Sequence, residues 1–382
     1  MLTLNGLATP IQQQEFVSQY WQRAHCFFKG GLSEFEDPIS ADELAGLACE
    51  TELTSRIVSG PNRNLELGPF SEQRLQAFET SHSTLLVQGV ELFVPELKTL
   101  RDAFSFIPLW RFEDVMVSFA TPNGGVGPHF DQYDVFLVQG EGCREWKVGQ
   151  RCDEHSETND SSGQKVLIDF QQAASYTLSK GDILYIPPGV AHWGESKDNS
   201  ICYSIGFRAP SGKELAAEWA HSLSAERKRF QDPPAGYETT SGVQITRSAI
   251  HQARGLLVDL LNNPAAIADA LGTFQSDNPN LEQLEAPSWA ELMEQLENGS
   301  QLRRTPGARS FFYCDQNSAR VYFNGHALAS ENVSIDWLEQ LCAADVLNIE
   351  DIRSLCTHKD DRISGRHKSL LLLAIQHQVY EL

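Results

Sequence analysis

The sequence predicts an α+β protein in three parts, of which the first is rich in β-strands and the other two are mainly helical. Short strands of alternating polar and apolar residues lie between residues 110 and 210, and a long amphipathic helical stretch lies within 211–275. A helix, a hairpin and further helices follow within 285–382. A chain of 382 residues is long enough for two or three domains. We therefore expect domains at 1–210, 211–275 and 285–382.

The first hundred residues predict a mixed support for the strands that follow. An amphipathic helix over residues 11–24 places Phe16, Tyr20 and Trp21 on roughly one face. A capping box formed by Ser40 and Glu43 opens a second helix. Strand-like pieces follow within 51–70 and 83–89, and a third helix within 95–104.

The strand from Asp114 to Ala120 has two different faces. Asp114, Met116 and Ser118 share one face, because side chains two residues apart point the same way. The other face is apolar and should pack on neighbouring structure. A row with a carboxylate, a thioether and a hydroxyl suits a pocket for a cationic side chain, but it could equally face solvent, and the alternation alone does not decide.

Two short motifs predict a metal site. His129 and Asp131 follow a turn at the spacing that puts an imidazole and a carboxylate on one side of a strand. Some sixty residues later, Gly181–Gly189 forms a strand and a Pro-Pro-Gly turn that presents His192. Two histidines and one carboxylate leave open positions on a metal, as in non-haem Fe(II) oxygenases. The alternative is a pair of ordinary loop histidines and a turn aspartate.

The strand from Cys143 to Val148 carries a basic residue on its apolar face. Arg144 alternates with Trp146 and Val148, so it should point inward. A buried Arg needs an anionic partner, and guanidinium binds carboxylate in bidentate geometry. A dicarboxylate cosubstrate would supply that partner, and an internal salt bridge is the alternative.

The last strand before the helical stretch, Ile201 to Phe207, has a row of small residues on one face: Cys202, Ser204 and Gly206. Small side chains leave room for a cosubstrate. Ser118 and Ser204 are therefore secondary candidates for contact with it, although tight packing of strands would select the same residues.

The rest of the chain predicts helices and a winged-helix unit. A helix capped by Ser211 precedes a linker at 231–242, and residues 246–262 form a helix with a stripe of Ala, Ile and Leu. This stripe must pack on the strand-rich part of its own chain or on a partner chain. The winged-helix pattern carries more acidic than basic residues, so we interpret it as structural or protein-binding.

Composition narrows the class of partner and the compartment. The net charge of −21 argues against phosphate-driven binding of nucleic acids and favours a basic protein partner. The 8 cysteines form no Cys-x-x-Cys pair, which fits a reducing cytoplasm. The chain shows neither a signal peptide nor a membrane-length apolar run, so we expect a cytoplasmic protein.

Three motifs together resemble a known family. They are Gly-x-Gly-Pro-His-x-Asp-x-Tyr-Asp-Val-Phe, Gly-Asp-x-Leu-Tyr-Ile-Pro-Pro-Gly-x-x-His and Tyr-Ser-x-Gly-Phe-Arg-Ala-Pro, within about residues 110–210. They are similar to the JmjC-type cupins, and most closely to bacterial ribosomal oxygenases. Weaker similarity covers the rest of the chain, including Tyr20–Arg23.

The resemblance implies a double-stranded β-helix (a cupin, or JmjC, jelly roll) that uses Fe(II), 2-oxoglutarate and O2. It implies that His129, Asp131 and His192 bind the metal and that Arg144 holds 2-oxoglutarate. The implied reaction is hydroxylation of the β-carbon of an arginine in the sixteenth large-subunit ribosomal protein. The 211–275 segment is implied to form a homodimer.

By the same resemblance, Asp114, Met116 and Tyr133 fall where the family contacts the substrate arginine. Arg rather than Lys at position 144, together with these three residues, favours arginine hydroxylation over histidine hydroxylation. Two alternatives stay open: a small-molecule cupin dioxygenase, and a non-catalytic scaffold that binds a partner.

Overall fold

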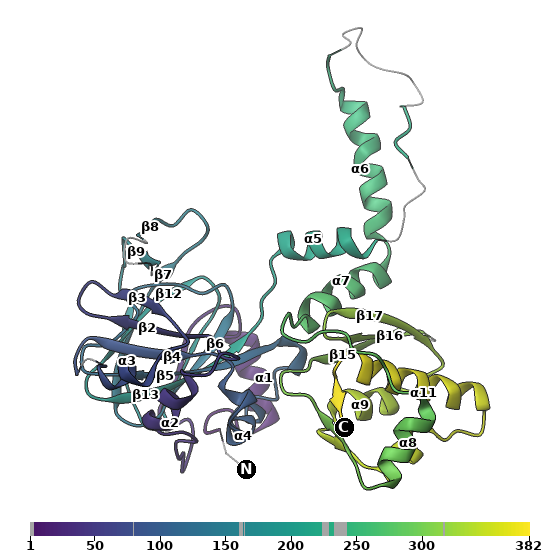
Figure 1. The fold of residues 1–382 in the computed structure, drawn as a ribbon. Helices are drawn as coiled ribbons and strands as arrows, with labels where there is room; N and C mark the ends of the chain where they lie inside the picture. The colour runs from purple at the N-terminus through teal and green to yellow at the C-terminus, as the bar shows by residue number, and fades with distance from the viewer. Residues whose placement is uncertain are drawn as a thin grey trace. The chain divides into compact units, whose positions relative to one another are not determined.

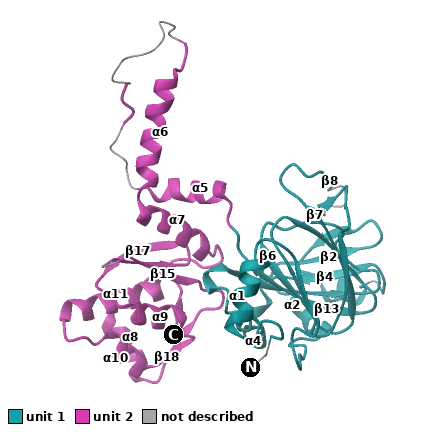
Figure 2. Cartoon of the chain, turned by 180° about the vertical axis from the view of Figure 1, so that it is seen from behind, with its two compact units in different colours: residues 1–209 teal, residues 210–382 magenta. Residues whose placement is uncertain are grey.

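The computed structural model describes residues 4–78, 80–159, 163, 165–223, 229–232, 243–315 and 318–382. The chain divides into two compact units, Met1–Ala209 and Pro210–Leu382, coloured teal and magenta in Figure 2. Residues 211–275 belong to the second unit, so a separate domain at that place stays a prediction. In the described ranges, no helix is long and apolar enough to cross a membrane.

The first unit consists of a large sheet, a smaller sheet and a set of short helices (Figure 1). The large sheet has the order β1 (Cys26–Phe28), β11 (Ile183–Ile186), β6 (Asp134–Gln139), β13 (Ser200–Phe207), β5 (Phe112–Ala120), β4 (Ser83–Val87), β2 (Ser55–Ser59), β3 (Asn64–Leu67). The smaller sheet has the order β10 (Ala174–Ser179), β7 (Cys143–Arg151), β12 (Val190–Ser196), and β8 (Thr158–Asn159) pairs with β9 (Val166–Leu167). The helices are α1 (Pro10–Gln19), α2 (Ala41–Leu47), α3 (Glu72–Gln76) and α4 (Glu96–Asp102), with 3-10 turns at Val90–Leu92 and Leu109–Arg111.

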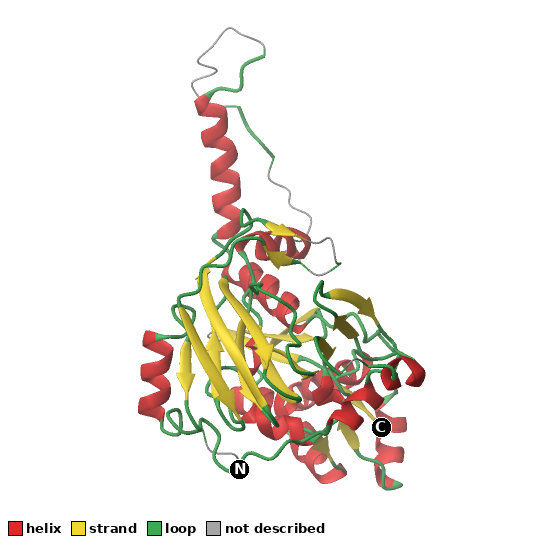
Figure 3. Ribbon diagram, turned by 90° about the vertical axis from the view of Figure 1, so that its left-hand side faces the viewer, coloured by secondary structure: helices red, strands yellow, loops and turns green. Residues whose placement is uncertain are grey.

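The large sheet, whose strands lie side by side in Figure 3, buries both of its faces. Its outer face supplies Val115, Val117 and Tyr203 to a core shared with the front helices. Its inner face supplies Leu137 and Ile186 to a second core, which it shares with side chains of the smaller sheet. Each fully buried side chain of this size contributes about 1.5–3 kcal/mol. Because the two sheets share this inner core, they face each other.

The alternation predicted for β5 is confirmed. Val115 and Val117 are fully buried in the outer core. Ser118 points to the inside, where its hydroxyl accepts a hydrogen bond from Arg144 of β7. The polar face of β5 therefore lines the interior of the barrel.

The second unit contains a helical segment and a winged-helix core. Its helices are α5 (Gly212–Ser222), α6 (Arg247–Leu261), α7 (Pro264–Ser276), α8 (Trp289–Glu297), α9 (Ile335–Ala343), α10 (Ile349–Cys356) and α11 (Asp361–Gln376). Its strands are β14 (Leu302–Arg304), β15 (Ser310–Asp315), β16 (Ser318–Phe323), β17 (His326–Glu331), β18 (Val346–Leu347) and β19 (Tyr380–Glu381). The linker predicted at 231–242 lies largely outside the described residues.

Helix α6 stands away from α5 and α7 in Figure 1. None of its side chains is buried, and Ile250 and Leu257 of the predicted apolar stripe are 58% and 55% exposed. Within the second unit the apolar stripe of α6 is therefore largely exposed.

Candidate metal centre

The backbone brings His129 and His192 together. The main-chain N–H of His129 donates to the carbonyl of His192 at 3.0 Å, and that of His192 donates to the carbonyl of His129 at 2.8 Å. The N–H of Gly189, in the Pro-Pro-Gly turn, donates to the carbonyl of Asp131 at 2.7 Å. The segment before β6 is thus fixed against β12 by its own peptide groups. His192 is the third residue of β12, which begins directly after the Pro-Pro-Gly turn.

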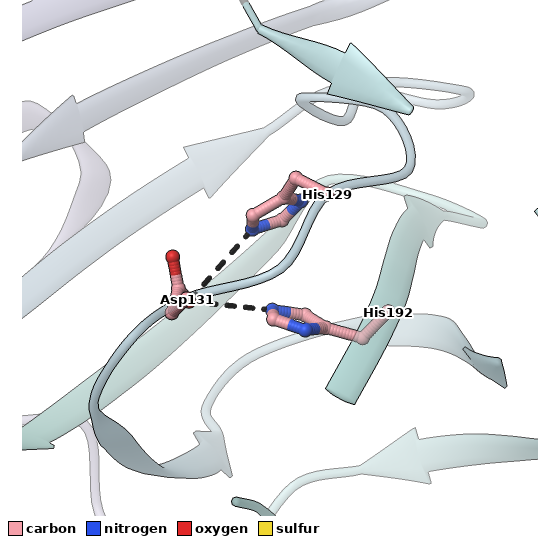
Figure 4. Close-up of side chains that lie close together, drawn as sticks. All are labelled: His129, Asp131 and His192. Atoms are coloured by element: carbon pink, nitrogen blue, oxygen red, sulfur yellow. Dashed lines mark ion pairs between the residues drawn. The ribbon is translucent and has the colours of Figure 1, made fainter. Parts of the chain in front are cut away.

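The three predicted ligand side chains converge, as Figure 4 shows. Nε2 of His192 is 3.5 Å, and Nε2 of His129 is 4.0 Å, from Oδ2 of Asp131. One ligand atom of each residue lies within 4.8 Å of the other two. Two imidazole nitrogens and one carboxylate oxygen at this spacing can share one metal ion.

The hydrogen bonds behind the rings prepare both nitrogens for a metal. Nδ1 of His129 lies 2.9 Å from the carbonyl oxygen of Gly127, and Nδ1 of His192 lies 3.0 Å from that of Val190. A carbonyl oxygen only accepts, so each Nδ1 carries the hydrogen and each Nε2 keeps its lone pair. This is the arrangement found behind metal-bound histidines. Burial, with the neighbouring His129, lowers the pKa of His192 to about 4, so its ring is neutral at pH 7. The donor set therefore fits Fe(II).

Arg144 lies inside the barrel, where its guanidinium forms hydrogen bonds only to neutral groups. Its Nη1 donates to the hydroxyl of Ser118 at 2.9 Å, and its Nη2 donates to the hydroxyl and carbonyl oxygens of Ser200 at 3.0 and 3.2 Å. No carboxylate pairs with it in the part of the chain that the structure describes, so the internal salt bridge is not observed there. Burial lowers the pKa of its guanidinium. A buried cation of this kind calls for an anionic ligand.

The two serine candidates occupy different places. Ser118 accepts a hydrogen bond from Arg144, and its contact with a cosubstrate stays a prediction. Ser204 stands opposite Met116 in the register of β13 and β5, farther along the sheet. Sequence reasoning missed Ser200, which binds Arg144 through two of its oxygen atoms. The alternation of β13 carries the signal, because Ser200 precedes Cys202 on the face that was expected to line the cavity.

The predicted substrate residues gather beside the metal ligands. Burial raises the pKa of Tyr133 well above its usual value, with further contributions from the carboxylates of Asp131 and Asp114. Tyr133 is 36% exposed, so part of the residue remains open to solvent. A Cβ atom at Gly206 would lie 3.3 Å from Oδ1 of Asp114, so this glycine gives the carboxylate room. Asp114 and Tyr133 therefore present polar groups next to the centre.

Comparisons with family models, curated proteins and solved structures all point to the same group of oxygenases. The model of the JmjC domain matches residues 99–215, and that of the ROXA-like winged helix matches 259–365. The chain is 35% identical over 328 residues to the ribosomal protein uL16 3-hydroxylase of Escherichia coli, covering 83% of this chain and 85% of that protein. It is 36% identical over 209 residues to a probable ribosomal oxygenase of Haemophilus influenzae, covering 54% and 52%. The structure of YcfD, a ribosomal oxygenase from Escherichia coli, with cobalt and 2-oxoglutarate superposes with a TM-score of 0.78 at 29% identity, covering 100% and 99%.

The facing sheets and the histidine–aspartate centre define a JmjC-type oxygenase with a winged-helix domain, so the predicted fold class is confirmed. More specifically, the chain belongs to the family of bacterial ribosomal oxygenases. The resemblance inferred from the sequence is thereby confirmed.

Proposed function

We propose that this protein is a 2-oxoglutarate- and Fe(II)-dependent hydroxylase of the ribosomal protein uL16, and that it hydroxylates the β-carbon of an arginine. One observation carries the proposal: a complete two-histidine, one-aspartate centre and an uncompensated buried Arg144 line the same barrel. The comparisons support it, since a curated relative is a uL16 3-hydroxylase and the solved structure of the ribosomal oxygenase YcfD holds cobalt and 2-oxoglutarate.

The chain's own residues would divide the work. His129, Asp131 and His192 would hold the metal, and Arg144, supported by Ser118 and Ser200, would hold the distal carboxylate of 2-oxoglutarate. When bound, the metal and 2-oxoglutarate supply the oxidation of a C–H bond by O2, with succinate and CO2 as by-products. The protein places the C–H bond and excludes water.

Recognition of the substrate would depend on Asp114, Met116 and Tyr133. The carboxylate of Asp114 suits a guanidinium, and the Met116 side chain suits its aliphatic stem. At the level of the whole surface, the net charge of −21 favours association with a basic ribosomal protein in the cytoplasm. That association should weaken as salt is added.

We also propose that the protein acts as a homodimer through α6. Ile250, Leu257 and Leu261 are all more than half exposed in the single chain. An amphipathic helix is stable in water when its apolar face is covered, and a second copy offers the same face. Intramolecular packing of α6 is the alternative.

The test is the dependence of 2-oxoglutarate turnover on uL16. The proposal predicts that purified uL16 stimulates succinate formation by the Fe(II)-loaded protein and gains one oxygen atom on an arginine, located by fragment mass spectrometry. Oxygen on a histidine would indicate a histidyl hydroxylase. Full turnover of a metabolite without uL16 would indicate a small-molecule dioxygenase. An unchanged activity in His129→Ala would indicate a scaffold.

A further inference from the structure

Arg56 lies on the inner wall of the barrel beside the predicted substrate residues, and no role described so far uses it. It stands opposite Leu86 in the register of β2 and β4, and Leu86 stands opposite Ser118 in the register of β4 and β5. Directly opposite residues share a face of the sheet. Arg56 therefore points to the same side as Ser118, and its Nη2 reaches to 3.6 Å from Sδ of Met116.

The guanidinium of Arg56 has no carboxylate partner in the part of the chain that the structure describes. Among the described residues it forms no ion pair, and its buried Nε finds no hydrogen-bond acceptor. The thioether of Met116 is only a weak acceptor, whereas a guanidinium carries five N–H donors. A partly buried cation in this state loses hydration without compensation, so a purely structural role explains it poorly. A ligand that accepts hydrogen bonds would explain it.

The surroundings of Arg56 indicate which ligand. Its charge acts on the hydroxyl of Tyr133, which the carboxylates of Asp131 and Asp114 also affect, so these groups share one region. Along the wall, a carboxylate at Asp114, a thioether at Met116 and a guanidinium at Arg56 follow one another. A cationic target side chain is attracted by the carboxylate and repelled by the guanidinium. The main-chain carbonyl oxygens beside that side chain are neutral acceptors that any bound peptide provides.

We propose that Arg56 is a substrate-binding residue that donates a hydrogen bond to a main-chain carbonyl oxygen of the protein substrate next to the target residue. The inference rests on the proposed function, because it assumes a peptide in this pocket. Arg56 and Asp114 then bind different parts of the same substrate. Asp114 binds the cationic target side chain, and Arg56 positions the main chain that carries it. Together they set how deep the target carbon reaches toward the metal.

The experiment compares Arg56→Met and Arg56→Lys with the wild-type full-length protein. Each is loaded with Co(II) and 2-oxoglutarate, which prevents turnover, and titrated with uL16 by calorimetry. Loss of one charged hydrogen bond should weaken uL16 binding by about tenfold or more in Arg56→Met. Arg56→Lys, which keeps the charge without the fork of donors, should lie between. The affinity for 2-oxoglutarate, measured without uL16, should change far less than the affinity for uL16 in both variants.

The matched control is Arg74→Met. Arg74 belongs to α3 and forms a two-point ion pair with Glu66, at 2.8 and 2.7 Å, so its donors are already occupied. Its loss should leave the affinities for uL16 and 2-oxoglutarate as they are. A weakened affinity of the same size in Arg74→Met would show a general effect of surface charge and would overturn the assignment.

Main-chain esters in a uL16 peptide identify the acceptor, because an ester carbonyl is a weaker acceptor than an amide carbonyl. One ester position should weaken binding to wild type and have no effect on Arg56→Met. Equal uL16 affinities of wild type and Arg56→Met, or ester effects that are identical in both, would overturn this inference alone. A wild-type protein that binds 2-oxoglutarate but not uL16 would instead count against the proposed function.

Discussion

Replacing Arg144 with Met should remove 2-oxoglutarate binding without destabilising the ligand-free protein. The guanidinium donates four hydrogen bonds to Ser118 and Ser200, but these hydroxyl and carbonyl groups do not neutralise it. Its charge is buried, with 5% of the residue exposed. Truncating one partner of a buried charge pair costs about 2–5 kcal/mol, so the Kd for 2-oxoglutarate should rise by about 30-fold to several thousand-fold.

The same substitution should not lower the free energy of unfolding of the ligand-free protein. An unpaired buried cation costs free energy of folding, and a Met side chain fills similar space without that cost. The loss of hydrogen bonds at two serine hydroxyls offsets part of the gain, at about 1 kcal/mol each. The ligand-free Arg144→Met variant should therefore melt at or above the wild-type temperature.

Thermal unfolding with Co(II) present measures both effects. At a 2-oxoglutarate concentration of about 100 times its Kd, binding stabilises the wild type by about 2.7 kcal/mol, which corresponds to about 5–10 °C in Tm. Arg144→Met should show a shift of at most about 3 °C at the same concentration. An equal shift in both proteins would refute Arg144 as the anchor, and a strongly lowered Tm of the ligand-free variant would refute the reasoning about its charge.

Three further predictions concern single features. Ser200→Ala removes the hydroxyl that accepts two hydrogen bonds from Arg144, so calorimetry should show about tenfold weaker 2-oxoglutarate binding, and an unchanged Kd would contradict this. Burial, and then His326, lower the pKa of His377 from 6.5 to about 4. The unfolded chain therefore binds the proton more tightly, and Tm should fall as the pH drops from 6.5 toward 4. His377→Phe should flatten that dependence in thermal scans, and an unchanged slope would exclude His377 as its source. In the double variant Ile250→Glu and Leu257→Glu, light scattering should show a monomer where the wild type is a dimer, whereas a dimeric variant would exclude α6 as the interface.

The metal centre can be predicted from the sequence because each ligand is positioned by residues next to it in the chain. The side chains of His129 and Asp131 are brought together by their spacing of two residues, and the Pro-Pro-Gly turn before His192 is written in the sequence. The inward direction of Arg144 follows from alternation in β7. His129 and His192 meet because their two segments pair with each other, and the fold class implies this pairing.

The features that the sequence does not reveal depend on contacts between strands that are distant in the chain. Arg56 lies in a short strand and reaches the pocket only because β2 and β4 extend the sheet beyond β5. The residues of β17 are mostly exposed, and they lack the apolar alternation that marks a strand. The sequence therefore predicts a two-stranded hairpin in the winged-helix unit, whereas the structure adds β17 as a third strand. The stripe of α6 indicates an apolar face but cannot say what covers that face.

The most direct test of the central claim is the intact mass of uL16 after incubation with the protein, Fe(II), ascorbate and 2-oxoglutarate. The account predicts a gain of one oxygen atom on uL16 with the wild-type protein and no gain with His192→Ala or Arg144→Met. Wild-type protein that consumes 2-oxoglutarate but leaves the mass of uL16 unchanged would contradict the proposed substrate. An equal gain with His192→Ala would contradict the metal centre itself.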